Sequence, residues 1–445
     1  MRSYYKYIVF MLFLIFSCSQ GLAFELVLPT EKRSVVNSNY ALFIGKIRSS
    51  ESVMFNNEWI FPASNGAFAH SVKLHEGENR VVIRSNYSTR VYNFCKKKQE
   101  AKPADEICDF DIRHVVVKKD NTPLRSTPVD AGLNRISHLF KDTKLLINGS
   151  KDGFYRVYLS KNKTAWIAKS DVEENCADKP PEFVNMSSQK YKNATIQTIS
   201  FTENLPYTVE DRDKEIVFKI YNPELSENSV YTLNIPKPAK YFYNVTLENG
   251  FYTFKVSEFP LSIEDCTIVI DAGHGGTEKG AIGCLGDMEK DINLKIALEL
   301  QKLLKEKGIN VIMTRECDGN ISLNERVKVA KENNADIFVS IHLNSIGDVK
   351  FDSHKHKGTS VYYFNRNSKE LAEILEKSVS RSAGTRKDGV RTASFAVTRP
   401  TEYVAVLVET AYMINPHDSV LYTSSDFAYN AAKGIANGII EFVSK

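Results

Sequence analysis

The sequence of 445 residues has little of what marks a nucleic-acid-binding or membrane-spanning protein. Lys and Arg number 58 and Asp and Glu number 54, a formal net charge of +4, and no block of like charge is long enough to form a basic arm. We therefore expect no nucleic-acid partner, although a mildly positive chain is compatible with an anionic polymer. The apolar run from Ile8 to Phe16 is too short to cross a bilayer.

That short apolar run instead predicts a secretory signal peptide over residues 1–23. Basic residues precede the run, and Gly21-Leu22-Ala23 places small residues at the expected cleavage point. A second interpretation stays open, because Ile15-Phe16-Ser17-Cys18 is similar to a lipobox, in which Cys18 would be lipidated and would anchor the protein to a membrane. We favour export without lipidation, to the periplasm or cell envelope on its extracellular face.

Cysteine is also scarce, and no Cys-x-x-Cys pair occurs, which argues against a closed cysteine-rich zinc shell. The six cysteines beyond Cys18 are even in number and export permits disulfides, but a chain of this length does not need them. A bridge between Cys95 and Cys108 would span the charged linker that separates them. The pairing itself cannot be read from the sequence.

What the sequence does contain is a set of three short apolar runs in its C-terminal part, each leading to a metal-competent or acidic side chain. They are Thr267–Asp271 leading to His274, Ile337–Ile341 leading to His342, and Val404–Val408 leading to Glu409. Runs of this length, rich in Val and Ile, predict buried strands. Because ligands gather at the carboxyl ends of strands in an α/β sheet, we expect these side chains to meet in one site.

A further carboxylate, Glu289, is expected in the first turn of a helix, where the helix dipole favours it. Gly308 closes this helix, and its apolar stripe at helical spacing comprises Ile292, Ile296, Leu300, Leu303 and Leu304. Two histidines and one glutamate, here His274, His342 and Glu289, form a standard catalytic zinc shell with an open position for water. Cys284 is either a further ligand or, more simply, a small loop residue.

Each of these residues also has an ordinary interpretation when taken alone. His274 could be a turn residue, and Glu289 a plain helix acid. Gly273–Gly276 could be a phosphate-binding loop, but the third glycine of a dinucleotide fingerprint and the Walker lysine are absent. Glu409 is harder to explain, because a carboxylate after a buried apolar run is costly unless it is paired or coordinated. Together, the four residues favour a metal-assisted active site.

The same residues resemble the zinc-dependent N-acetylmuramoyl-L-alanine amidases of the type-three catalytic fold. The resemblance covers about Cys266 to Lys445 and is carried, in order, by Thr267-Ile268-Val269-Ile270-Asp271-Ala272-Gly273-His274-Gly275-Gly276, Glu289-Lys290-Asp291, Met313-Thr314-Arg315, Ser322-Leu323-Asn324-Glu325-Arg326, Ser340-Ile341-His342-Leu343-Asn344, Lys357-Gly358-Thr359-Ser360-Val361-Tyr362-Tyr363 and Val406-Leu407-Val408-Glu409. It implies that His274, Glu289 and His342 bind zinc and that Glu409 is the catalytic acid/base. Asn344 is a weaker candidate for substrate contact, and a turn residue at a strand end fits it equally well.

An enzyme of this family would act on peptidoglycan, hydrolysing the amide between N-acetylmuramic acid and L-alanine of the stem peptide. Zinc lowers the pKa of bound water from about 15.7 toward about 7, and Glu409 would take a proton from that water and return it to the departing amine. Two alternatives stay open: a zinc peptidase acting on stem peptides, and a non-hydrolytic wall-binding or activator protein with a retired amidase domain. The four intact residues argue against retirement.

The chain ahead of this domain is expected to form small all-β modules, so the predicted fold class is multidomain, with a C-terminal α/β domain of three layers and a mixed sheet. Residues 24–99 resemble an immunoglobulin-like sandwich. Residues 110–175, through Thr122-Pro123-Leu124, Gly153-Phe154-Tyr155 and Ala165-Trp166-Ile167, resemble a bacterial Src-homology-3-type barrel, a module that often binds peptidoglycan in wall enzymes. Residues 190–263 predict a small β domain of unknown role, and residues 264–445 the catalytic domain.

The connection between Asn344 and Gly358 holds thirteen residues, including His354 and His356. It is too short for the helical insertion that covers the zinc in some regulated relatives. We therefore predict that no internal helix closes the site, which leaves regulation to an activator protein or to the β modules. His354 and His356 are expected to be exposed loop residues.

Overall fold

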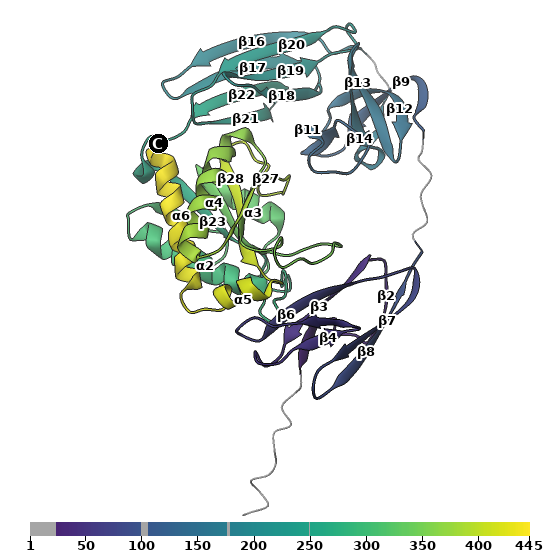
Figure 1. Ribbon diagram of the computed structural model, residues 1–445. Coiled ribbons are helices and arrows are strands. Elements are labelled where there is room, and N and C mark those ends of the chain that lie inside the picture. The colour runs from purple at the N-terminus through teal and green to yellow at the C-terminus, as the bar shows by residue number, and fades with distance from the viewer. Residues whose placement is uncertain (1–23, 99–105, 176–178, 249) are drawn as a thin grey trace, which may run out of the picture.

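The computed structural model describes residues 24–98, 106–175, 179–248 and 250–445. The predicted signal peptide, with Cys18, and also Cys176 lie outside the described residues. Figure 1 shows all-β modules in the N-terminal part of the chain and an α/β domain at its C-terminal end. Within the described ranges, no helix is long and apolar enough to cross a membrane.

The first module, in residues 24–98, packs two sheets against each other around a core that includes Phe43, Phe55 and Phe68. One sheet contains, in spatial order, β1 (Glu25–Leu28), β3 (Tyr40–Lys46) and β6 (Ala67–Lys73). The other contains β2 (Arg33–Val36), β8 (Thr89–Lys96), β7 (Gly77–Arg84), β4 (Val53–Phe55) and β5 (Glu58–Ile60). Buried and partly exposed positions alternate along β4 and in the second half of β8, as expected for strands with one face on a core.

The second module is a single seven-stranded antiparallel sheet, whose inner face carries Leu124, Val157 and Ile167. Its strands, in spatial order, are β11 (Arg135–Leu139), β10 (Thr122–Arg125), β14 (Lys163–Ala168), β13 (Phe154–Ser160), β12 (Lys144–Lys151), β9 (Cys108–Val117) and β15 (Val172–Glu174), with the short helix η1 (Lys169–Asp171) before β15. Phe154 and Trp166 are buried, but neither belongs to the apolar core of this module. They lie on the face of the sheet opposite to core residues such as Ala165 and Ile167.

The third module again pairs two antiparallel sheets. One contains β16 (Phe183–Lys190), β17 (Ala194–Phe201), β22 (Phe251–Glu258) and β21 (Tyr241–Glu248), and the other β18 (Tyr207–Asp211), β19 (Glu215–Tyr221) and β20 (Val230–Pro236). The strand β16 begins at Phe183, seven residues before residue 190, where we expected this domain to begin. Its core is continuous with that of the second module, and the rings of Phe140 and Tyr207 stack across the junction at 5.8 Å.

The C-terminal domain has a six-stranded mixed sheet. Its strands, in spatial order, are β24 (Asn310–Met313), β23 (Thr267–Ala272), β25 (Ile337–Asn344), β28 (Val404–Tyr412), β26 (Thr359–Tyr363) and β27 (Lys387–Thr392). The first four are parallel, whereas β26 runs antiparallel to β28. The three apolar runs singled out in the sequence are the neighbouring strands β23, β25 and β28, so their carboxyl ends lie at one edge of the sheet.

Helices cover both faces of this sheet, which gives three layers. One face packs against α2 (Glu289–Lys305), α4 (Lys369–Ala383) and α6 (Phe427–Ser444), and the other against α3 (Leu323–Glu332). The remaining helices are η2 (Ile263–Asp265), η3 (Arg366–Ser368) and α5 (Pro416–Tyr422). Because Ile268 and Ile270 face α2 while Val269 faces α3, the continuous apolar run of β23 is buried on both faces.

The first module also contacts the C-terminal domain, at the lower edge of that domain in Figure 1. Ile44 and Ala69 of the module share an apolar cluster with Cys284, Phe351 and Ile414. The Asp348 carboxylate accepts a hydrogen bond from the Asn39 backbone N–H at 2.7 Å, and the Phe351 N–H donates to the Ser71 hydroxyl at 2.9 Å. The loops on either side of the predicted zinc site therefore rest on the first module.

The described cysteines are all free thiols. Cys95 and Cys108 form no bridge, so the disulfide considered across their linker is absent from the described residues. Cys284 is fully buried, and its Sγ donates to the Ile414 carbonyl at 3.3 Å. Burial raises the pKa of the Cys284 thiol to about 12. Among the described residues the group that could hold a metal comprises His274, Glu289 and His342, so Cys284 fits a small packed loop residue.

Candidate active site

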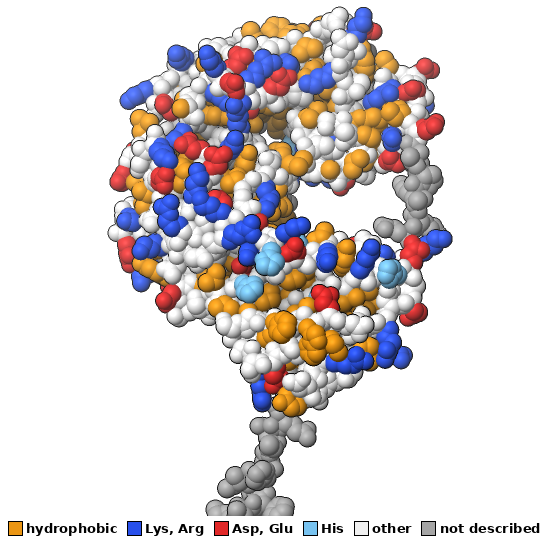
Figure 2. Space-filling view, viewed as in Figure 1, with side chains coloured by type: hydrophobic (Ala, Val, Ile, Leu, Met, Phe, Trp, Pro, Cys, Tyr) orange, Lys and Arg blue, Asp and Glu red, His pale blue; other side chains and the backbone are white. Residues whose placement is uncertain are grey.

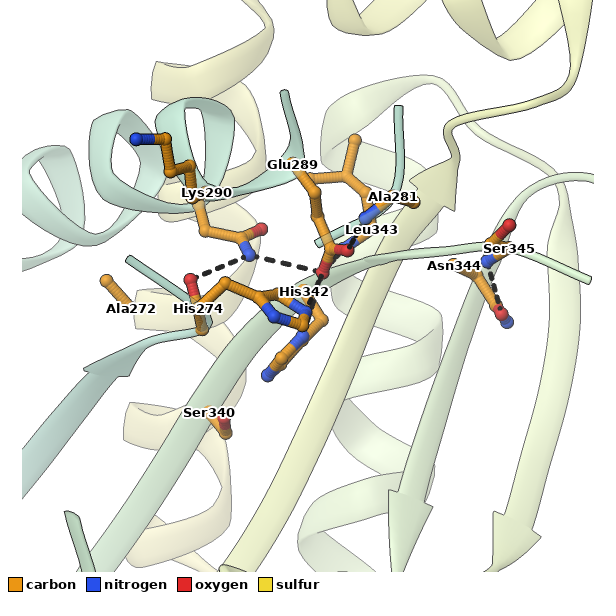
Figure 3. Close-up of polar contacts among 12 residues, drawn as sticks. Ala272, His274, Ala281, Glu289, Lys290, Ser340, His342, Leu343, Asn344 and Ser345 are labelled. Atoms are coloured by element: carbon orange, nitrogen blue, oxygen red, sulfur yellow. Dashed lines mark hydrogen bonds and ion pairs between the residues drawn. The ribbon is translucent and has the colours of Figure 1, made fainter. Parts of the chain in front are cut away.

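The carboxyl ends of β23, β25 and β28 bring the predicted site residues together. His274 follows β23 directly, and His342 near the end of β25 pairs in register with Glu409 on β28. Glu289 is the first residue of α2, and Figure 3 shows it reaching down from that helix toward both histidine rings. These four residues are separated by between 15 and 135 positions along the chain. They meet because parallel neighbouring strands end together at one edge of the sheet.

His274, Glu289 and His342 form a compact group that could hold a metal ion, with one ligand atom from each lying within 4.8 Å of the others. Glu289 Oε1 lies 2.8 Å from His342 Nδ1 and 3.2 Å from His274 Nε2. The two imidazole rings stand nearly edge to face, with ring centres 4.9 Å apart. This set of two imidazoles and one carboxylate is the donor set of catalytic zinc sites.

Two glycines leave the space that this group occupies. A Cβ on Gly273 would lie 2.3 Å from the His342 ring, and one on Gly280 would lie 2.5 Å from Glu289 Oε2. Contacts this short do not occur in folded proteins, so only glycine fits at both positions. His274 itself has φ of +59°, a left-handed conformation that is strained for a residue other than glycine. The backbone is thus adapted to present the His274 side chain at this point.

The Glu289 carboxylate is 4% exposed and is surrounded by donors. Ala281 N–H donates to Oε2 at 2.8 Å, and Asn293 Nδ2 and Leu343 N–H each donate to Oε1 at 3.3 Å. Burial opposes the charge of this carboxylate, but hydrogen bonds from His274 and His342 outweigh it and hold the pKa of Glu289 well below its ordinary range. Glu289 is therefore ionised at neutral pH, as a metal ligand must be.

Glu409 is different, because its Oε2 is buried and has no hydrogen-bond partner among the described residues. Burial, and then the neighbouring Glu289 charge, raise the pKa of Glu409 well above its ordinary value. An orphaned buried carboxylate oxygen beside a His, Glu and His donor set is the arrangement expected where a bound cation and its water complete the site. The residues present therefore fit a metal ion.

A buried polar scaffold holds the His274 loop in place. Asp271, 1% exposed, accepts hydrogen bonds from Arg326 Nη1 at 2.6 Å and from the Ser340 hydroxyl at 2.7 Å. Arg326 Nη2 also donates to the His274 carbonyl at 2.8 Å, and Arg315 Nη2 donates to the Gly273 carbonyl at 3.0 Å. We did not single out these arginines as site residues, although both lie in segments that carry the family resemblance.

Asn344 lies to one side of the histidine and glutamate group (Figure 3). Its Oδ1 accepts a hydrogen bond from the Ser345 N–H at 2.8 Å, and its Nδ2 donates to the Ser360 hydroxyl at 3.4 Å. In the following loop His354 is exposed, whereas the His356 ring is half-buried against Phe351 and accepts a hydrogen bond from the Asp352 N–H at 3.0 Å. Residues 345–357 contain no helix.

Comparisons with known proteins match the C-terminal part of the chain. The sequence profile of the N-acetylmuramoyl-L-alanine amidase family matches residues 268–441. The uncharacterised protein YqiI of Bacillus subtilis is 38% identical over 181 residues, which are 40% of this chain and 84% of YqiI. The N-acetylmuramoyl-L-alanine amidase LytC of the same organism is 37% identical over 180 residues, 40% of this chain but only 35% of LytC.

Among solved structures, the catalytic domain of CwlV, an N-acetylmuramoyl-L-alanine amidase from Bacillus (Paenibacillus) polymyxa var. colistinus, is similar to this chain. It is 38% identical, and the match covers 40% of this chain and 98% of that domain, with a TM-score of 0.38. The matches to YqiI, LytC and CwlV each cover about two fifths of the chain.

Proposed function

Because this chain belongs to the N-acetylmuramoyl-L-alanine amidase family, we propose that the whole protein is a zinc-dependent peptidoglycan hydrolase that cleaves the amide between N-acetylmuramic acid and L-alanine. The observation that carries this proposal is the group formed by His274, Glu289 and His342 beside the unpartnered carboxylate of Glu409. Each side chain has the chemistry that such a hydrolysis requires.

In this proposal His274, Glu289 and His342 hold the zinc ion. When bound, zinc supplies a Lewis acid and makes water available as a nucleophile near neutral pH. Hydrogen bonds from the Ala281 N–H and from Asn293 Nδ2 would hold the Glu289 carboxylate in place as a ligand. Arg326 and Arg315 fix the backbone of residues 273–274, so the first histidine ligand does not depend on a mobile loop.

Glu409 acts as the acid/base. Its carboxylate takes the proton of the attacking water and then delivers that proton to the nitrogen of L-alanine as the amide bond breaks. Two observations support this role: Glu409 pairs in register with His342 on the adjacent strand, and its Oε2 has no hydrogen-bond partner among the described residues. The Asn344 side chain is hydrogen-bonded to Ser345 and Ser360. It contributes a substrate contact only if hydrogen bonds to the substrate replace these two bonds.

Two other functions use the same side chains. A zinc peptidase would cut within stem peptides, and a retired amidase domain would bind peptidoglycan without hydrolysing it. The family membership favours the amidase, and the presence of all three candidate ligands and Glu409 disfavours retirement.

The β modules and the N-terminal residues give the proposal its setting. We infer that the protein is exported through the signal peptide of residues 1–23, with membrane anchoring only if Cys18 is lipidated. The first module is proposed to be immunoglobulin-like, because two packed sheets, antiparallel except for the parallel pair of β2 and β8, form its core. The second is proposed to be of the Src-homology-3 type and to bind the wall, and an activator protein remains a proposed partner.

Product analysis tests the activity directly. The purified full chain, without residues 1–23, is incubated with peptidoglycan after chelation, with and without added zinc, and new amino termini are identified. Zinc-dependent appearance of L-alanine amino termini on intact stem peptides is the expected result. Other amino termini would identify a peptidase, and bound zinc with no products would favour an activator-dependent or retired domain.

A further inference from the structure

A cavity of about 1120 Å³ lies where the second and third modules meet the C-terminal domain. Its walls come from β11 and the residues around it, from β18 and β21, and from residues 396–402 ahead of β28. The walls are joined by direct contacts: the Tyr207 hydroxyl donates to the His138 carbonyl at 2.8 Å, and the Tyr243 N–H donates to the Thr401 carbonyl at 3.0 Å. The cavity is large enough for a small-molecule ligand.

Three acidic side chains in the walls of this cavity are already paired with cations. Asp211 accepts hydrogen bonds from Lys237 and from the Tyr241 hydroxyl. Glu210 pairs with Lys219 at 2.6 Å and with Arg212 at 2.6 Å, and Glu402 pairs with Lys331 at 2.5 Å. These carboxylates therefore have no need of a further cation.

Two arginines in the walls, Arg135 of the second module and Arg399 of the C-terminal domain, have no such partner. In the described part of the chain, no carboxylate oxygen lies within 4.0 Å of either guanidinium group, the distance at which an ion pair forms. Arg135 Nε is buried and makes no hydrogen bond. The guanidinium of Arg399 donates to the Ser394 carbonyl at 2.9 Å, and Asn365 bonds to the Arg399 carbonyl at 2.9 Å, so this arginine is held in place.

The two guanidinium groups are close enough to repel each other. Burial and then the Arg135 charge lower the pKa of Arg399 to about 10. Asp130 favours the charge of Arg135, but this carboxylate already pairs with Arg125 at 2.6 Å. His138 Nε2 is buried in the same wall without a hydrogen-bond partner. Two like charges and two orphaned polar atoms in one cavity are unfavourable unless a ligand compensates them.

We propose that this cavity binds an oxyanion, a carboxylate or a phosphate, carried by a polar ligand, and that the guanidinium groups of Arg135 and Arg399 grip it from opposite domains. Guanidinium groups recognise planar or tetrahedral oxyanions through paired, charge-assisted hydrogen bonds. The neutral His138 ring and the nearby Ser137 offer additional polar contacts. Because Arg135 and Arg399 belong to different domains, a bound oxyanion would also join the second module to the C-terminal domain.

The site is separate from the proposed zinc centre. Residues 396–402 precede the amino end of β28, whereas Glu409 lies toward its carboxyl end. Binding of an oxyanion therefore does not require hydrolysis, and its failure would leave the proposed amidase activity untouched.

Calorimetry on the full chain at neutral pH and constant ionic strength tests the proposal. The probes are inorganic phosphate and N-acetylglutamate, which separate a phosphate from a carboxylate ligand. We expect at least one probe to bind, and Arg135→Gln and Arg399→Gln each to weaken it about tenfold or more. The control Arg113→Gln removes an exposed arginine of the same module and should leave binding unchanged.

A thermal unfolding series provides the second measurement. Without a probe, Arg135→Gln should unfold at the same or a higher temperature than wild type, because one of two repelling charges is gone. With the probe, only wild type and Arg113→Gln should gain stability. If a glutamine variant does not fold, Arg135→Lys and Arg399→Lys replace it. Both keep the positive charge but lose the paired hydrogen bonds of a guanidinium group, and each should still bind the probe more weakly than wild type. No binding of either probe, or equal binding by the double glutamine variant, would overturn the proposal.

Discussion

The charged groups near the two ends of β28 differ in whether they have partners of opposite charge or hydrogen-bond donors around them. Near its carboxyl end, the buried charges of Glu289 and Asp271 are each surrounded by donors, whereas Glu409 keeps an oxygen that has no partner among the described residues. Ahead of its amino end, Arg399 and Arg135 face a cavity without a counter-charge. At the carboxyl end, the domain's own residues pair most of the charged groups and a bound cation would complete the site, whereas at the other end two guanidinium groups have no carboxylate partner among the described residues.

The difference follows from how each site is assembled. The zinc-site residues come from one domain, where neighbouring strands and one helix place them to within hydrogen-bond distance. The arginines come from two domains, and no local element constrains both. A site within one domain can be pre-organised by its own core, whereas a site between domains depends on how these domains dock.

The largest expected effect is at the carboxyl end of β28. Glu409→Gln should lower kcat by about 10²- to 10⁴-fold, because the amide cannot accept the proton of the attacking water. Zinc content, measured by metal analysis, and phosphate binding at the other end should not change. Glu441→Gln, an exposed glutamate on α6, is the matched control. Activity of Glu409→Gln close to that of wild type would remove Glu409 from the mechanism.

A smaller effect is expected where the glycines make room for the ligands. In Gly273→Ala, the new Cβ would lie 2.3 Å from the His342 ring, so the ring must move. We expect zinc affinity to fall about 10- to 100-fold, as it does when groups that orient metal ligands are altered. Gly319→Ala is the control, since nothing lies within 4 Å of a Cβ at that position. Competition with a chelator measures the zinc affinity of both variants, and equal values would show that the space at Gly273 is not needed by the metal site.

The smallest effect concerns pH at the amino end of β28. Burial, together with Arg135, Arg399 and Arg125, lowers the pKa of His138 to about 4 from an ordinary 6.5. The unfolded chain therefore takes up this proton at a higher pH than the folded protein, and His138 lowers stability as pH falls from about 6.5 to about 4. The loss is at most about 3 kcal/mol, since one pKa unit corresponds to about 1.4 kcal/mol.

His138→Asn should remove that part of the pH dependence and leave stability above about pH 7 nearly unchanged. Denaturant midpoints measured across this range, for wild type and variant, provide the comparison. A bound phosphate would offset the arginine charges and should make the wild-type curve less steep. Identical curves for the two proteins would show that His138 does not sit in a strongly positive environment.

Much of the C-terminal domain could be predicted from the sequence. The runs 267–271, 337–341 and 404–408 are strands, and Glu289 begins a helix whose stripe of Ile292, Ile296, Leu300 and Leu304 is buried. These elements have strong local signals, namely uninterrupted apolar runs and helical spacing. The grouping of His274, Glu289 and His342 could also be predicted, because parallel strands deliver their carboxyl ends to one edge.

Other features had weaker signals. The bridge considered between Cys95 and Cys108 is absent, since cysteine spacing does not specify pairing. The roles of Arg326 and Arg315 depend on which carbonyl groups they reach, which is a matter of side-chain direction in the folded domain. The contact of Ile44 and Ala69 with Cys284 and Phe351 joins segments more than 200 residues apart and has no local pattern.

The sequence by itself therefore determined the catalytic chemistry that we propose, because that chemistry lies in residue types placed at the ends of elements with strong periodicity. Only the tertiary structure decided what surrounds it. The docking of the first module on the loops beside the site, the scaffold of buried arginines and the cavity that contains Arg135 and Arg399 all arise where surfaces from distant segments of the chain meet. Such surfaces are specified by complementary shape and charge across domains, which no single segment records.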